Sequence, residues 1–92
     1  MPPVFEFDIA KSASNKEKHG IDFDDAQRLW GTGSELVIPA RPLENELRMA
    51  IIGKLDEKNW VAVYTMRGET IRLISVRPAR VKEVEYYESS RI

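Results

Sequence analysis

LRMAIIGKLDEKNWVAVYTMRGETIRLISV, residues 47–76, predicts the centre of the fold. It contains three runs rich in β-branched, aliphatic and aromatic residues, at 47–54, 59–65 and 70–76. The segments between them, LDEKN and MRGE, have the length and the turn-forming residues of hairpin loops. We therefore expect three antiparallel strands joined by two hairpins.

The segments on either side extend this sheet. ELVIPAR, residues 35–41, is predicted to be an edge strand, because Pro39 cannot donate a hydrogen bond to a neighbouring strand. VFEFD, residues 4–8, alternates apolar and polar residues and is predicted to form a short strand.

Helices are expected at both ends of the chain. Asp8 can cap a helix over 9–18 that Gly20 ends, and Asp22 can cap a second helix over 23–30. A last helix is predicted over 79–89. This order predicts an α+β fold: one compact domain over residues 1–92, with an antiparallel sheet of about four strands, two N-terminal helices and one C-terminal helix.

Composition limits the function classes. The chain has 92 residues, no cysteine and a net charge of −1, so neither a disulfide framework nor thiolate chemistry is expected. No apolar run approaches the roughly 18 residues of a membrane span. We expect a cytoplasmic protein that makes no membrane contact.

The positive charge is concentrated in one segment. RGETIRLISVRPARVK, residues 67–82, carries four arginines and Lys82 against the single acid Glu69. Guanidinium groups bind phosphates bidentately and stay charged, and the four arginines are expected to converge at one end of two neighbouring strands, as an anion or nucleic-acid site. For Arg72 the alternative is a structural salt bridge to an acid of the first or second helix.

His19 is the only histidine and the only side chain whose unperturbed pKa is near neutrality. It could act as a general acid or base. It could equally stabilise the C-terminus of the first helix, where the helix dipole favours an imidazolium.

The aromatic residues leave similar alternatives. Trp60 and Tyr64 share one face of a strand and are core residues by default, but Trp60 could stack on a base. Tyr87 could be a core residue or a phenolic donor near the arginines. No set of metal ligands is present in the sequence, so neither a metal nor another cofactor is expected.

Three stretches resemble the BrnT toxin family of bacterial type II toxin–antitoxin systems. They are FEFDIAKSASNKEKHGIDFDDA at 5–26, YTMRGETIRLISVRPA at 64–79 and KEVEYYE at 82–88. The most specific patterns are KHG-φ-x-F-x-x-A and RG-x-x-(I/L)-R-φ-I-S-x-R, where φ is apolar. The last helix departs from the family: Arg80 stands at its capping position, and Val84 and Glu85 replace basic residues.

The resemblance implies a RelE-like fold and a metal-independent endoribonuclease that cleaves RNA and inhibits translation. Its partner would be a BrnA-type ribbon-helix-helix antitoxin. The toxin would contact promoter DNA only indirectly, through this antitoxin. Arg67, Arg72, Arg77 and His19 are the expected catalytic residues. The expected RNA contacts are Lys16, Lys18, Trp60, Tyr64, Arg80, Lys82 and Tyr87. The less basic last helix leaves an alternative, a weak or inactive subunit that mainly binds the antitoxin in an autorepressor complex.

Overall fold

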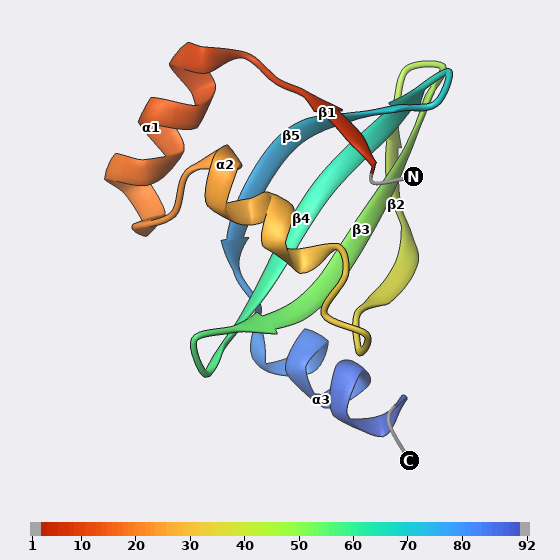
Figure 1. The fold of residues 1–92 in the computed structure, drawn as a ribbon. Coiled ribbons are helices and arrows are strands. Elements are labelled where there is room, and N and C mark those ends of the chain that lie inside the picture. The colour runs from red at the N-terminus through yellow and green to blue at the C-terminus, as the bar shows by residue number, and fades with distance from the viewer. Residues whose placement is uncertain (1–2, 91–92) are drawn as a thin grey trace.

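A computed structural model, which describes residues 3–90, has one five-stranded sheet with helices before and after it (Figure 1). The strand order is β1-β5-β4-β3-β2. The strands are β1 (Val4–Glu6), β2 (Leu36–Leu43), β3 (Glu46–Leu55), β4 (Lys58–Arg67) and β5 (Thr70–Pro78). The helical elements are α1 (Ile9–His19), α2 (Phe23–Ala26), the 3-10 turn η1 (Gln27–Leu29) and α3 (Val81–Ser89). The predicted α+β class is confirmed.

The sheet differs from the prediction in strand number and direction. β2, β3, β4 and β5 form the expected antiparallel meander, but β1 adds a fifth strand that runs parallel to β5. Glu6 is opposite Arg72 in that pair. The pairing joins segments more than sixty residues apart, and local periodicity carries no information about such a partner.

The capping predictions for α1 hold. An Asp8 carboxylate oxygen accepts a hydrogen bond from the Lys11 backbone N–H at 3.1 Å. Gly20 has a φ of +83°, and its N–H donates to the Lys16 carbonyl, which ends α1 after His19. A residue with a side chain would be strained in this left-handed conformation.

The second helix is shorter than predicted. Asp22 caps α2 by accepting from the Asp25 N–H at 2.8 Å. The helix tightens into η1 after Ala26, and Trp30 is already extended. The apolar positions keep helical spacing, because Phe23, Ala26 and Leu29 all point into the core.

One face of the sheet is covered by helical elements over its central part. α2 and η1 lie across β4 and β3 (Figure 1) and bury Phe23 and Leu29 against Ile51, Ala62 and other strand residues. α1 follows the β5 edge beyond β1. There Asn15 accepts from the Val76 N–H at 3.3 Å and donates to the Ile21 carbonyl at 2.8 Å, and this satisfies backbone groups that no strand pairs.

The opposite face is covered at one end only. α3 packs Tyr87 onto a small cluster with Ala50, Ile52 and Val61. The rest of this face carries no helix among residues 3–90, and the polar side chains described next lie on it.

Candidate functional site

The first part of the site is a groove on the open face, with a volume of about 390 Å³. Strands β2 to β5 form its floor and the start of α3 forms one wall. Val63, Ile74 and Ala50 line the floor, and four arginines line the rim: Arg41, Arg48, Arg77 and Arg80. An apolar floor with guanidinium groups around it can hold a base and a phosphate together.

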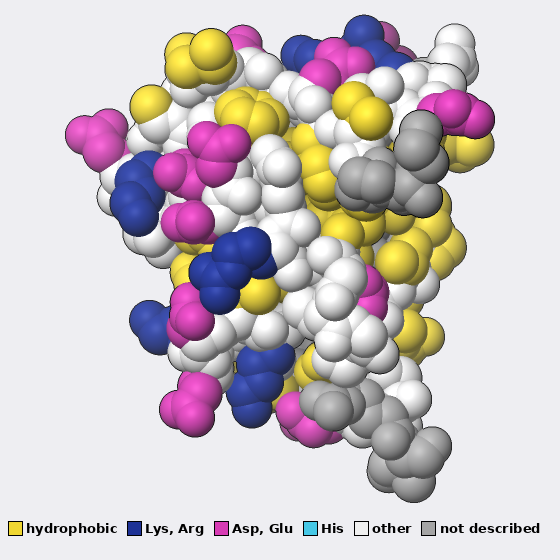
Figure 2. All heavy atoms as spheres, viewed as in Figure 1, with side chains coloured by type: hydrophobic (Ala, Val, Ile, Leu, Met, Phe, Trp, Pro, Cys, Tyr) yellow, Lys and Arg dark blue, Asp and Glu magenta, His cyan; other side chains and the backbone are white. Residues whose placement is uncertain are grey.

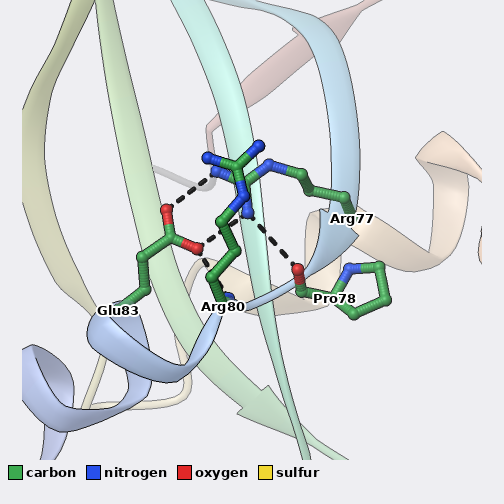
Figure 3. A network of polar contacts seen from close by, with 4 residues as sticks. All are labelled: Arg77, Pro78, Arg80 and Glu83. Carbon is green, nitrogen blue, oxygen red and sulfur yellow. Dashed lines mark hydrogen bonds and ion pairs between the residues drawn. The ribbon is translucent and has the colours of Figure 1, made fainter.

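Arg77 is anchored by a carboxylate of α3 (Figure 3). Its two terminal nitrogens donate to the two carboxylate oxygens of Glu83 at 2.7 and 2.8 Å. Glu83 also accepts from the Arg80 backbone N–H at 2.7 Å, so one carboxylate both caps α3 and ties it to β5. The hydrogen bonds from Arg77 lower the pKa of Glu83 to about 2, and the same contact raises the pKa of Arg77.

The Arg80 side chain extends from the start of α3 over β4 (Figure 3). Like Arg77, it lines the groove. Arg80 is exposed, and within residues 3–90 it has no ion-pair partner. At the α3 end of the groove, the Arg77 guanidinium is therefore paired with a carboxylate, whereas the Arg80 guanidinium is open to an anion.

The second part of the site is a smaller pocket of about 230 Å³ at the other end of the open face. Three arginines line it: Arg48 from β3, Arg67 from the end of β4 and Arg72 from β5. Lys11, at the start of α1, completes the basic wall. Arg48 and Ile74 line both the groove and this pocket, so the two are continuous.

Two of these arginines have carboxylate partners. Arg72 donates to Glu6 at 2.7 Å, and Arg48 donates to Glu46 at 3.3 Å. The predicted alternative of a structural salt bridge for Arg72 is therefore observed, but the acid lies on β1 and not on a helix. Arg67 is exposed and forms no ion pair with any residue in the described part of the chain.

The four predicted arginines do not converge at one end, so this expectation is wrong. Arg67 and Arg72 lie at the hairpin that joins β4 to β5, whereas Arg77 and Arg80 lie at the far end of β5. Arg77 is five positions after Arg72 along β5, which is roughly 16 Å at the usual strand rise. The open face thus has two basic ends and not a single cluster.

His19 does not join either group. The start of α1 reaches the pocket through Lys11, and His19 is eight residues further along the same helix, which is about 12 Å away at 1.5 Å per residue. It is half-buried in the last turn. The structure separates His19 from the arginines with which it was expected to act.

Lys16, Lys18 and Lys82 are exposed, but they do not line the groove or the pocket. The three aromatic candidates are buried. Trp60 and Tyr64 belong to the core under α2, and the Tyr87 hydroxyl lies 3.2 Å from the Ser34 hydroxyl, away from the arginines. Their rings are covered by protein, as the core alternative for these residues expects, and their position does not support the RNA contacts expected of them.

The sequence reasoning missed Arg41, Arg48 and Lys11. Arg48 alternates with Ala50 and Ile52 on β3, so strand parity would have placed it on the same face as those residues. Arg41 and Lys11 had no comparable signal, because only the pairing of β2 and the packing of α1 place them at the site.

The face covered by α2 has a different character. Figure 2 shows Lys and Arg side chains interspersed there with Asp and Glu, and one such pair is Arg28 with Asp56 at 3.2 Å.

No helix in the described part of the chain is long and apolar enough to cross a membrane. Residues 3–90 contain no group of three or more His, Cys, Asp and Glu residues placed to hold a metal ion.

An α+β domain that presents an open, arginine-lined sheet face is suited to binding a polyanion. The family comparison identifies which class of polyanion-binding protein this is. The family model described as "Ribonuclease toxin, BrnT, of type II toxin-antitoxin system" matches residues 7–83 of the 92 residues. The chain therefore belongs to the BrnT family of ribonuclease toxins. Comparison with curated proteins finds no match.

Proposed function

We propose that this protein is a metal-independent endoribonuclease whose active face is the open side of the sheet. The observation that carries the proposal is the continuous arginine-lined surface formed by the groove and the pocket. Fixed positive charge can hold the RNA backbone and stabilise the extra negative charge that develops on a scissile phosphate. RNA recognised in this way is single-stranded, because its bases must reach the apolar floor.

The reaction is intramolecular attack by the substrate 2′-oxygen on the adjacent phosphorus. The 2′-hydroxyl gives up its proton as its oxygen forms the new P–O bond of a 2′,3′-cyclic phosphate, and the P–O5′ bond breaks as the 5′-oxygen leaves with a proton. We assign the scissile phosphate to the pocket, where Arg48, Arg67 and Arg72 lie together, and a neighbouring phosphate to Arg77 and Arg80. Lys11 and Glu46 line the pocket and can carry the proton, a step worth about 10²–10⁴-fold in rate.

The test is incubation of antitoxin-free protein with RNA in EDTA, with and without ribosomes. We expect cleavage and a 2′,3′-cyclic phosphate end, detected by the resistance of the 3′ end to labelling until the cyclic phosphate has been opened and removed. Absence of cleavage by stoichiometric protein under both conditions would overturn the proposal. Cleavage that EDTA abolishes would overturn its metal independence.

In the cell we propose that RNA cleavage inhibits translation in the cytoplasm and that a BrnA-type antitoxin neutralises it. Membership of a type II toxin family supports a protein antitoxin. The antitoxin would supply a ribbon-helix-helix DNA-binding domain, so that the toxin reaches promoter DNA only as part of the complex.

One observation favours a second candidate, a weak or inactive toxin that mainly binds the antitoxin. Glu83 occupies both terminal nitrogens of Arg77, and Glu6 occupies one of Arg72, so two of the three arginines expected to be catalytic are already paired with carboxylates. Expression in cells separates the candidates. Slowed growth without the antitoxin supports the nuclease, whereas normal growth together with co-purification of the antitoxin supports the binding subunit.

A further inference from the structure

A second surface lies at the same end of the sheet as the three-arginine pocket. Leu47, Met49 and Met66 form a hollow of about 500 Å³ on the face that α2 covers, beyond the reach of that helix. We call these three residues the sheet-end patch. Leu47 is 79% exposed and Met66 is 49% exposed. Figure 2 shows apolar side chains gathered on this side of the face, over β3 and β2.

The edges of the sheet do not offer a template for an added strand. β2 forms one edge and contains Pro39 and Pro42, which have no N–H to donate. β1 forms the other edge and has only three residues, and α1 binds the β5 edge beyond it through Asn15. Such edges resist pairing with another strand. A protein partner must therefore dock through side chains, on a face or at an end.

The sheet-end patch is continuous with the basic pocket. Glu46 and Thr65 line both, and the Thr65 hydroxyl donates to the Leu47 carbonyl at 2.7 Å, which holds the end of β4 against β3. The two hairpin turns, β2–β3 and β4–β5, meet at this end (Figure 1). A segment that crosses the turns would touch apolar side chains on one side and Arg48, Arg67 and Arg72 on the other.

We propose that the sheet end is the docking site of the antitoxin. The occupant is a segment whose apolar residues cover the sheet-end patch and whose neighbouring acidic residues reach Arg67, the pocket arginine that lacks a carboxylate partner in the described chain. An apolar anchor beside complementary charge is a common arrangement of protein interfaces. The inference rests on the proposed function in that the same contact would close the pocket to RNA.

Charge favours the antitoxin over a second copy of the chain as the occupant. A symmetric dimer through the patch would bring two copies of the same rim together. The pocket in that rim is lined by four basic residues (Lys11, Arg48, Arg67 and Arg72) and two acidic ones (Asp8 and Glu46), so mostly like charges would meet. A partner with its own acidic residues satisfies the apolar and the basic side at once.

The experiment measures binding of the cognate antitoxin, the product of the neighbouring reading frame, to the full chain by titration calorimetry. Leu47→Gln with Met66→Gln should weaken binding at least about thirtyfold, because two apolar contacts are replaced by polar ones of similar shape. The matched controls are Ile9→Gln on α1 and Val81→Gln on α3, which are 80% and 75% exposed and should bind within about twofold of wild type. Arg67→Ala should slow association at low salt and have less effect at high salt.

Melting temperatures near that of wild type will show that the variants fold. Unchanged affinity in the Leu47→Gln, Met66→Gln protein would overturn the proposal, as would an equal loss in either control. A dimer of the toxin alone that this double change dissociates, with antitoxin affinity intact, would also overturn it and would assign the patch to self-association. RNA cleavage by the free variants is measured in parallel, so that a failure of the nuclease proposal is seen independently of the binding result.

Discussion

At the scale of single residues, the sequence identified the charged groups but not their partners. Arg72 and Arg77 were predictable as unusual cations within a strand and at its end. Their partners are Glu6 and Glu83, and only Glu83 is a sequence neighbour, six residues away on the next helix. Glu6 reaches Arg72 through the parallel β1–β5 pair, which depends on the whole fold. Ion pairs between distant elements cannot be derived from composition.

The Arg77–Glu83 pair makes stability depend on pH in a defined direction. The pKa of Glu83 is about 2 in the folded protein, below its ordinary value of 4.5. Its contribution is therefore fully present above about pH 4.5 and is lost as pH falls from 4.5 towards 2. Glu83→Gln should cost about 1 kcal/mol at pH 7, given that the pair is partly exposed.

Urea unfolding of the wild type and Glu83→Gln between pH 7 and pH 2.5 checks this. The difference in unfolding free energy should shrink as the pH is lowered. Glu88→Gln, an exposed carboxylate on the same helix, is the control and should leave stability within about 0.5 kcal/mol. A pH-independent difference between wild type and Glu83→Gln would contradict the assigned pair.

His19 provides a second test at this scale. Because it lies along α1 away from the arginine pocket, His19→Gln should leave the cleavage rate within about twofold of wild type and cost about 0.5–1 kcal/mol of stability through the helix C-terminus. Single-turnover RNA cleavage and thermal unfolding measure the two effects. A hundredfold loss of cleavage in a normally folded variant would mean that His19 transfers a proton after all.

Among the helices and strands, the sequence predicted correctly those features that depend only on residues close together in the chain. The Asp8 and Asp22 caps and the Gly20 stop follow from backbone chemistry within a few residues, and the alternation through 47–76 gave the meander. The shortened α2 and the parallel β1 were not predictable in the same way. Packing against the sheet sets where α2 ends, and β1 is defined only by its pairing with β5.

Gly53 shows how packing between elements limits which residue can occupy a position within a strand. A β-carbon at Gly53 would lie 2.9 Å from Leu29 Cδ2, and Leu29 is fully buried under η1. Gly53→Ala should therefore destabilise the protein by about 1–3 kcal/mol, because Leu29 has little room to move. Lys54→Ala, at the neighbouring exposed position, is the control and should have a small effect.

The double variant Gly53→Ala, Leu29→Ala locates the cause. If the two side chains compete for one space, the cost of Gly53→Ala measured in the Leu29→Ala background should fall by at least about 1 kcal/mol. Chemical denaturation of the four proteins completes the cycle. Additive costs would show that Gly53 is required for some reason other than contact with Leu29.

At the scale of the whole molecule, the sequence predicted the class of fold and the presence of a basic surface but not its shape. The segment 67–82 was expected to gather its arginines at one end. The strand instead spreads them along the open face, and Arg41, Arg48 and Lys11 join them from elements that carried no such signal. The sheet-end patch was missed for a similar reason. Leu47, Met49 and Met66 alternate like core residues, but Leu47 and Met66 are exposed because no helix among residues 3–90 covers them.

In the proposed function, the open arginine-lined face carries the ribonuclease chemistry. Arg67 tests it most directly, because it lines the pocket, is exposed, and has no ion-pair partner within residues 3–90 whose loss could disturb the fold. The measurement is the single-turnover rate of RNA cleavage in EDTA for Arg67→Ala relative to Arg28→Ala, an exposed arginine on the opposite face. We expect a loss of about a hundredfold for Arg67→Ala and no more than twofold for Arg28→Ala. Normal cleavage by a folded Arg67→Ala protein would contradict it.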